Sequence, residues 1–119
     1  MTTIDRGFWN GKCVFLTGHT GFKGSWFSLW LTSLGATVKG YALSPPTMPS
    51  LFNEAKIDSL IDSQIGDIRD QDALHNSMTI FNPDVLIHMA AQPLVGYSYD
   101  EPIETYEVNV IGTAKVLEV

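Results

Sequence analysis

A short apolar run, followed at once by three regularly spaced glycines, limits this chain to few folds. Residues 12–17, KCVFLT, are largely apolar and lie between two glycines, which is typical of a strand buried on both faces. The next segment, GHTGFKG, leads into apolar residues at helical spacing that end at Gly35. The sequence therefore predicts a strand, a tight glycine turn and a helix over 12–35.

The alternation of strand and helix continues along the chain. The most apolar later stretch, 84–91, is expected to be a buried strand, whereas the helical spacing over 51–63 is weak. Right-handed crossovers between such units place helices on both faces of a parallel sheet. The predicted fold class is α/β with about four β-α units: strands at 12–17, 36–43, 63–68 and 84–91, and helices at 21–35, 51–63, 69–81 and 102–119. The Pro-rich segment 43–50 and the segment from 92 to about 101 are expected to be loops.

The glycine turn has the composition of a phosphate-binding site. Gly18 and Gly21 let the backbone turn tightly and approach a pyrophosphate, and the following helix N-terminus contributes about half a positive charge. Gly24 lets that helix press close to the sheet. The spacing is G-x-x-G-x-x-G, which differs from the general dinucleotide fingerprint G-x-G-x-x-G and from the Walker A loop. Its position at the first strand-helix junction favours dinucleotide binding over a turn without a ligand.

Composition excludes several other functions. The formal net charge is -6 with only seven Lys and Arg residues, which argues against nucleic-acid binding. A single cysteine, Cys13, permits neither a disulfide framework nor a cysteine metal site, and it suggests the cytoplasm. No signal peptide or membrane span is expected, because no apolar stretch approaches the required length. The length of 119 residues fits one domain or part of one.

Several motifs together resemble the extended short-chain dehydrogenase/reductases, and most closely the CDP-glucose 4,6-dehydratases among them. The turn TGHTGFKGSW is similar, and further matching segments occur in the same order over the whole chain: GYAL, PSLF, GDIRD (66–70), HMAAQPLV (88–95), SY (98–99) and NVIGT (109–113). The resemblance implies that 1–119 is the amino-terminal part of a Rossmann-like NAD(P)-binding domain, incomplete and without its catalytic and substrate-binding part.

The same resemblance implies the cofactor-binding residues. Asp67 would accept from the adenine amino group and Ile68 would lie along the ring, although a solvated strand-end acid is the alternative for Asp67. The segment 90–92 would line the nicotinamide ribose, and Asn109 would join a supporting hydrogen-bond network. The full expected set is Gly18, His19, Thr20, Gly21, Phe22, Lys23, Gly24, Asp67, Ile68, Ala90, Ala91, Gln92 and Asn109.

Three residues with reactive side chains receive no catalytic role. His19 and Lys23 are expected to contact a phosphate or a ribose, or simply to lie at the surface, because the pyrophosphate lies far from the nicotinamide. His88 is expected to be a packed, hydrogen-bonded core residue, since a metal site there lacks partners. No metal ligand is therefore predicted.

The choice between NAD and NADP stays open at this stage. The dinucleotide fingerprint expects an acid about 20 residues beyond the turn, or an arginine for a 2'-phosphate. Neither residue type occurs between Arg6 and Asn53, and the resemblance favours NAD. Gly96 also departs from the family pattern, in which an arginine often occupies this position.

The catalytic residues of the family are missing from this chain. The resemblance implies a Tyr-x-x-x-Lys pair with a Ser or Thr, and an Asp-Glu pair in the dehydratases. None of the tyrosines at 41, 97, 99 and 106 is followed four residues later by lysine. We therefore expect no catalytic residue here, and an isolated chain without activity.

The function implied is the cofactor-binding portion of an NAD-dependent nucleotide-sugar 4,6-dehydratase that converts CDP-glucose to CDP-4-keto-6-deoxyglucose. In the full-length enzyme the partner would be a nucleotide-sugar substrate, and a homodimer or larger assembly is expected. The alternatives are that the chain is part of a nucleotide-sugar epimerase or reductase, or that it is a non-catalytic dinucleotide-binding module.

Overall fold

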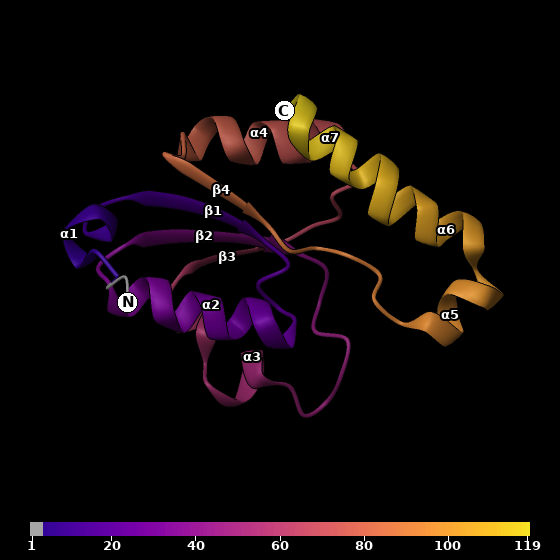
Figure 1. Ribbon diagram of the computed structural model, residues 1–119, viewed down its shortest axis with the longest axis horizontal. Coiled ribbons are helices and arrows are strands. Elements are labelled where there is room, and N and C mark those ends of the chain that lie inside the picture. The colour runs from indigo at the N-terminus through magenta and orange to yellow at the C-terminus, as the bar shows by residue number, and fades with distance from the viewer. Residues whose placement is uncertain (1–3) are drawn as a thin grey trace.

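The computed structural model describes residues 4–119 and shows a four-stranded parallel sheet between two layers of helices (Figure 1). The strand order is β3-β2-β1-β4, so the chain runs outward from β1 to β3 and then crosses back to the other side of β1. The α/β fold class predicted from the sequence is confirmed. The strands are β1 (Cys13–Thr17), β2 (Thr37–Ala42), β3 (Asp62–Ile65) and β4 (Val85–His88).

The helices cover both faces of the sheet, as expected. α2 and α3 lie on one face, whereas α4 and α7 lie on the other, and α5 lies beyond the end of the sheet (Figure 1). This distribution follows from the change in direction of the crossovers after β3. The helices are α1 (Arg6–Trp9), α2 (Phe22–Ser33), α3 (Leu51–Glu54), the 3-10 helix η1 (Ile57–Ser59), α4 (Gln71–Phe81), α5 (Val95–Asp100), α6 (Pro102–Tyr106), the π-helical η2 (Glu107–Gly112) and α7 (Thr113–Glu118).

Some segments differ from the prediction. The expected helix over 51–63 is divided into α3 and η1, because Lys56 adopts a left-handed conformation with φ 51° between them. The short helices α1 and α5 form where no helix was expected. β4 stops at His88, and beyond it the amides of Met89 and Ala90 donate to the Thr17 hydroxyl.

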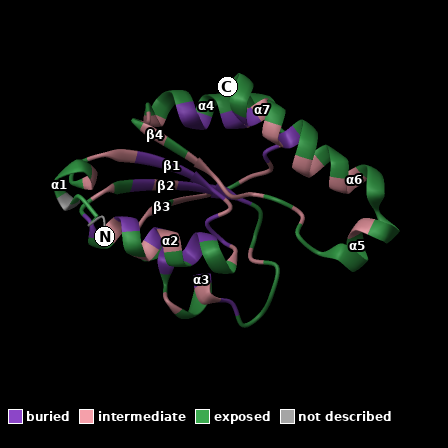
Figure 2. Cartoon of the chain, in the orientation of Figure 1, coloured by how far each residue is buried: buried purple, intermediate pink, exposed green. Residues whose placement is uncertain are grey.

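The strand predicted within 84–91 is present, but the prediction that it is buried is wrong. β4 pairs only with β1 among the described residues, and its Leu86 is 36% exposed. Figure 2 shows buried residues concentrated on β1 and β2, and intermediate or exposed ones on β4. An edge strand lacks the second neighbour that buries the inner strands.

The core has two parts, one on each face of the sheet. Consecutive side chains of β1 point to opposite faces, so Phe15 packs on one side and Val14 and Leu16 on the other. All three are fully buried. The buried members of the first part are Phe15, Tyr41, Ile68, Leu74, Met78 and Val116, and those of the second are Val14, Leu16, Leu31 and Val38.

α2 packs on the sheet through small residues, although its large apolar side chains lie at helical spacing. Trp26 is 55% exposed and Trp30 is 46% exposed. The side turned inward carries Ser25 and Ser28, whose hydroxyls donate to His19 O at 2.9 Å and to Gly24 O at 2.9 Å. Small residues permit a closer approach of helix and turn than large ones, and the hydrogen bonds offset the burial of the hydroxyls. The buried residues of α2 are Gly24, Ser25, Ser28 and Leu31.

The first turn of α4 yields a prediction about stability. The Asp70 carboxylate caps the helix by accepting from Ala73 N at 3.1 Å. We expect Asp70→Ala to lower the free energy of unfolding by about 1 kcal/mol, because the Ala73 amide loses its partner. Urea denaturation measures the change. Gln71→Ala is the matched control, with an effect below about 0.5 kcal/mol, and equal effects of the two variants would contradict the capping role.

Candidate functional site

The carboxyl ends of all four strands open into one cleft of about 620 Å³. The cleft lies where the crossovers change direction, between the ends of β1 and β4, which is the position where open α/β sheets bind ligands. Each strand contributes residues at its carboxyl end or just beyond it. They include Gly18 after β1, Ala42–Ser44 at the end of β2, Gly66–Ile68 after β3 and Met89–Ala91 after β4.

Two glycines of the turn cannot carry a side chain without moving backbone. Gly18 has φ +82°, and a Cβ there would lie 2.6 Å from the carbonyl carbon of Met89. At Gly24 a Cβ would lie 2.0 Å from the carbonyl oxygen of Gly18. A Cβ at Gly21 would make only an ordinary contact at 3.5 Å, so internal packing does not require this glycine. Because Gly21 lines the cleft, the space left by its missing side chain belongs to the site.

The N-terminus of α2 faces the cleft without a capping side chain. Gly21 occupies the cap position, and no acidic residue lies in the first turn. The helix α4, of similar length, is instead capped by Asp70. The first amides of a helix have no intrahelical acceptors and carry a partial positive charge, so the first turn of α2 is suited to an anion. Lys23, which also lines the cleft, adds a formal positive charge.

The His19 side chain lies in the interior and does not line the cleft. The residue is fully buried, its Nε2 lies 2.7 Å from Ser63 Oγ, and its ring packs edge-on against Phe52 at a centroid distance of 5.4 Å. Gly40 makes room for the ring, since a Cβ there would lie 2.3 Å from it. Burial lowers the pKa of His19 to about 4. The imidazole is therefore neutral at pH 7 and packs the turn against β2 and β3.

Asp67 lies at the cleft and forms an ion pair with Arg69. The guanidinium donates from Nη2 at 2.6 Å and from Nε at 3.0 Å, and the Arg69 amide donates at 2.9 Å. These hydrogen bonds hold the pKa of the Asp67 carboxyl below its usual value. The carboxylate is ionised at neutral pH, and its side chain is 27% exposed. The neighbouring Ile68 is 4% exposed and belongs to the core, with its Cδ1 near Gly112.

The segment after β4 is held by Asn109 to the last helix, which α6, η2 and α7 form in succession. Gln92 N donates to Asn109 Oδ1 at 2.7 Å, and Asn109 Nδ2 donates to Gln92 O at 3.0 Å. The Gln92 side chain donates to Thr105 and Leu94 and accepts from the Leu94 amide. Both amide side chains are used inside the chain, so they shape the wall of the cleft without lining it.

Ten of the thirteen residues predicted from the sequence line the cleft; His19, Gln92 and Asn109 do not. The sequence did not predict several other residues that line the cleft. Met89 could have been found because it directly follows a strand, whereas no pattern pointed to Val108 on the helix. The ten are Gly18, Thr20, Gly21, Phe22, Lys23, Gly24, Asp67, Ile68, Ala90 and Ala91, and the missed lining residues include Pro46, Thr47, Gly66, Met89, Pro93, Leu94 and Val108.

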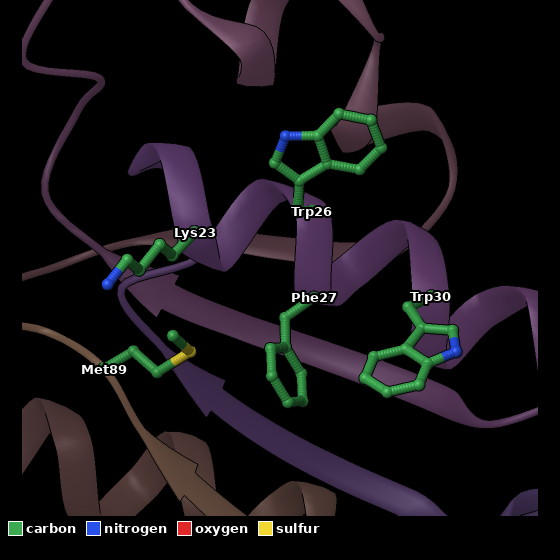
Figure 3. Close-up of a pocket in the computed structure, with 5 residues that line it drawn as sticks. All are labelled: Lys23, Trp26, Phe27, Trp30 and Met89. Atoms are coloured by element: carbon green, nitrogen blue, oxygen red, sulfur yellow. The ribbon is translucent and has the colours of Figure 1, made fainter. Parts of the chain in front are cut away.

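A second, shallower pocket of about 390 Å³ lies beside the first, along α2. Figure 3 shows Trp26, Phe27 and Trp30 along α2, and Met89 from the segment after β4. The rings of Phe27 and Trp30 meet at a centroid distance of 5.8 Å. Lys23 and Met89 line both pockets. The exposed tryptophans of α2 thus form an apolar surface next to the cleft.

Residues 4–119 contain neither a helix that could span a membrane nor a cluster of metal-ligating side chains. No helix in this range combines the length and the apolar character needed to cross a membrane. The same range holds no group of three or more His, Cys, Asp or Glu residues arranged to hold a metal ion. His88 contacts two threonine hydroxyls, with Nδ1 2.6 Å from Thr17 Oγ1 and Nε2 3.0 Å from Thr113 Oγ1.

Known proteins share this sequence and this fold. The chain is 62% identical over 115 residues to the CDP-glucose 4,6-dehydratase of Salmonella typhimurium, covering 97% of this chain and 32% of that protein. It is 37% identical to the UDP-glucose 4-epimerase of Halalkalibacterium halodurans, over 88% of this chain and 30% of the relative. The crystal structure of UDP-glucose 4-epimerase from Brucella ovis in complex with NAD matches with a TM-score of 0.78 and 30% identity, covering 91% of this chain and 31% of that one.

All three of these proteins are named as dehydratases or epimerases of nucleotide sugars. The chain spans about a third of the length of the curated relatives just described. The resemblance to dehydratases noted in the motifs is thereby confirmed over nearly the whole chain. The family model of GDP-mannose 4,6 dehydratase matches residues 15–119, and the chain therefore belongs to the GDP-mannose 4,6 dehydratase family.

Proposed function

We propose that this chain is the cofactor-binding part of an NAD-dependent nucleotide-sugar 4,6-dehydratase, and that the full enzyme acts on CDP-glucose. The observation that carries the proposal is the uncapped N-terminus of α2, which faces the cleft beside Gly18 and Gly24, where a side chain would collide with backbone. The 62% identity to a CDP-glucose 4,6-dehydratase supports the choice of substrate. NAD would supply a group that accepts a hydride and later returns it.

The residues of the cleft fit a dinucleotide. The uncrowded position at Gly21 and the uncapped first turn of α2 suit the pyrophosphate. Asp67 is ionised and retains accepting capacity for the adenine amino group, and the small Ala90 and Ala91 leave room for the nicotinamide ribose. Lys23 would neutralise phosphate charge. His19, Gln92 and Asn109 would hold the walls, since they do not line the cleft.

Further parts of the proposal concern the full enzyme. The 1–119 segment would be the amino-terminal part of its NAD(P)-binding domain, with the substrate site in the region that the relatives have in addition. A homodimer or larger assembly is supported by exposed apolar side chains on the last helix, among them Ile103, Tyr106 and Val110. We place the enzyme in the cytoplasm, where the thiol of Cys13 stays reduced.

The test of the function uses the full-length protein that continues this chain. Incubation with CDP-glucose is expected to yield a 4-keto-6-deoxy sugar, detected by NMR, with NAD returned unchanged. UDP-glucose and GDP-mannose are the comparison substrates. A product inverted at C4 without loss of water would support the epimerase instead, which the relative from Halalkalibacterium halodurans makes the second candidate. NAD binding without conversion of any of these sugars would support a non-catalytic module.

The role of Asp67 leads to a prediction about NAD affinity. We expect Asp67→Asn to weaken NAD binding by about tenfold, or about 1.4 kcal/mol, because the amide replaces the charged acceptor of the adenine amino group. Calorimetry measures the dissociation constant. Nicotinamide hypoxanthine dinucleotide lacks that amino group, so the wild-type protein should prefer NAD whereas Asp67→Asn should discriminate less.

The control for this prediction is Asp62→Asn. Asp62 lies on β3 with a side chain that is 64% exposed, paired with Lys39 at 3.4 Å, and it does not line the cleft. Its substitution should leave both dissociation constants unchanged. If Asp67→Asn loses equal affinity for the two dinucleotides, the carboxylate does not recognise the adenine amino group.

A further inference from the structure

We propose that His88 is a positioning residue whose imidazole, held as the Nε2-H tautomer, fixes the cleft-lining segment 89–92 between β1 and the last helix. His88 lies on β4, and its place in an apolar strand predicted only a packed, hydrogen-bonded core residue. The distances around its two ring nitrogens determine where its proton lies. They also connect it to both ends of the segment that carries Ala90 and Ala91.

The Nδ1 side of the ring meets a hydroxyl whose lone pairs are already used. Thr17 Oγ1 accepts from Met89 N at 3.0 Å and from Ala90 N at 3.1 Å, and the Met89 amide is shared with Thr17 O at 3.1 Å. A hydroxyl has two lone pairs and one proton. With both lone pairs occupied, the Thr17 O-H must donate to His88 Nδ1, which lies 2.6 Å away. Nδ1 therefore carries no proton.

The Nε2 side requires the same tautomer independently. His88 Nε2 lies 3.0 Å from Thr113 Oγ1. The Thr113 hydroxyl donates its own proton to Asn109 O, four residues earlier, at 2.6 Å. Its oxygen can only accept from the ring, so Nε2 carries the proton. The donors then run in one direction, from Thr17 to His88, to Thr113 and to Asn109.

This chain of hydrogen bonds holds both ends of the segment 89–92, which forms one wall of the cleft. Thr17 binds the amides at the start of the 89–92 segment, and Asn109 binds both backbone groups of Gln92 at its end. His88 joins these two anchors across the junction of the sheet and the last helix. Loss of the ring would release the helix from β1 and let the segment move. A neutral ring also suits its surroundings, because burial lowers the pKa of His88.

The tautomer is tested on the unsubstituted protein by long-range 1H-15N correlation spectra of the 119-residue chain labelled with 15N-histidine. The chain has three histidines, and His88→Gln assigns the signal by its disappearance. We expect a protonated Nε2 and an unprotonated Nδ1 at pH 7. A protonated Nδ1, a mixture of tautomers or an imidazolium at that pH would overturn the proposal.

The positioning role is tested by amide hydrogen exchange, which does not depend on NAD. His88→Leu should speed the exchange of the Ala90 and Gln92 amides by about tenfold relative to those of Val14 and Leu16. His88→Gln retains a donor near the Nε2 position and should restore part of the protection even if the leucine variant unfolds. His75→Gln, on the exposed side of α4, is the matched control and should change nothing. Uniform acceleration at all amides in both His88 variants would contradict the positioning role and would mean that His88 only packs in the core.

A consequence for affinity rests on the proposed function. If the cleft binds NAD, His88→Gln should weaken binding less than His88→Leu, and the order should follow the exchange of Ala90. If the wild-type protein binds no NAD, the proposed function fails, while the tautomer and exchange results still decide the role of His88. Equal NAD affinity in the wild type and His88→Leu, in a protein that binds NAD, would show that the segment needs no such support.

Discussion

Replacing Gly24 with alanine is expected to weaken NAD binding about 100-fold and to destabilise the protein by about 3 kcal/mol. The new Cβ would lie 2.0 Å from Gly18 O and 2.9 Å from His19 Cα, both of them backbone atoms. Backbone cannot move aside as a flexible side chain can, so α2 must shift away from the glycine turn. The shift displaces the helix N-terminus from the cleft, and an affinity loss of about 100-fold, or about 2.7 kcal/mol, should follow. Chemical denaturation and calorimetry measure the two effects.

Two other glycines serve as controls and separate packing from ligand binding. A Cβ at Gly21 meets only Gly18 O at 3.5 Å, yet Gly21 lines the cleft. Gly21→Ala should therefore reduce NAD affinity while changing the free energy of unfolding by less than about 1 kcal/mol. Gly96 has nothing within 4 Å of its Cβ position and should tolerate alanine in both assays. Wild-type NAD affinity in a folded Gly24→Ala variant would show that the turn is not the phosphate site.

Acidification from pH 7 to pH 4 is expected to cost the folded protein about 3 kcal/mol through His19 alone. The pKa of His19 is about 4 in the folded protein and 6.5 as its ordinary value. Between these two values the unfolded chain binds a proton that the buried imidazole does not. Stability therefore falls by about 1.4 kcal/mol per pH unit as the pH drops below 6.5, and levels off below pH 4.

Denaturation of the wild type and of His19→Gln across this range measures the His19 contribution. Glutamine does not titrate, so the variant should be less stable at pH 7 but lose about 3 kcal/mol less on acidification. Asp67 does not interfere. Its pKa is lowered from 3.8, so its stabilising ion pair is present throughout this range and is lost as the pH falls further, in both proteins. Parallel pH profiles of the two proteins would mean that the imidazole is accessible to protons in the folded state.

Much of the fold was predictable because its determinants are local. The strand at 12–17, the glycine turn and a helix ending before Gly35 were all recognisable, since hydrophobic period and turn residues act over a few positions. The division of 51–63 was not, because nothing in the sequence marks the left-handed backbone at Lys56. The exposure of β4 depends on how many strands flank it, which is a property of the whole sheet.

The candidate site was predictable to a similar degree. Its glycines and strand-end residues follow from the rule that ligands bind at the carboxyl ends of parallel strands. The direction of individual side chains did not follow, and His19 is the clearest case. Its neighbours in sequence suggested a phosphate contact, but Gly40, Phe52 and Ser63 together form an interior space that accepts the ring.

By itself the sequence determined the order of strands and helices, the place of the turn and the family, because spacing and motif are properties of neighbouring residues. Only the tertiary structure decided that α2 buries serines and glycine while Trp26 and Trp30 stay exposed. It also decided that Asn109 forms a hydrogen bond with Gln92 and that His88 forms hydrogen bonds with both Thr17 and Thr113. Thr17 and Thr113 are 96 positions apart in the sequence (113 - 17). Contacts of this range depend on the packing of the sheet against the last helix, which no local pattern encodes.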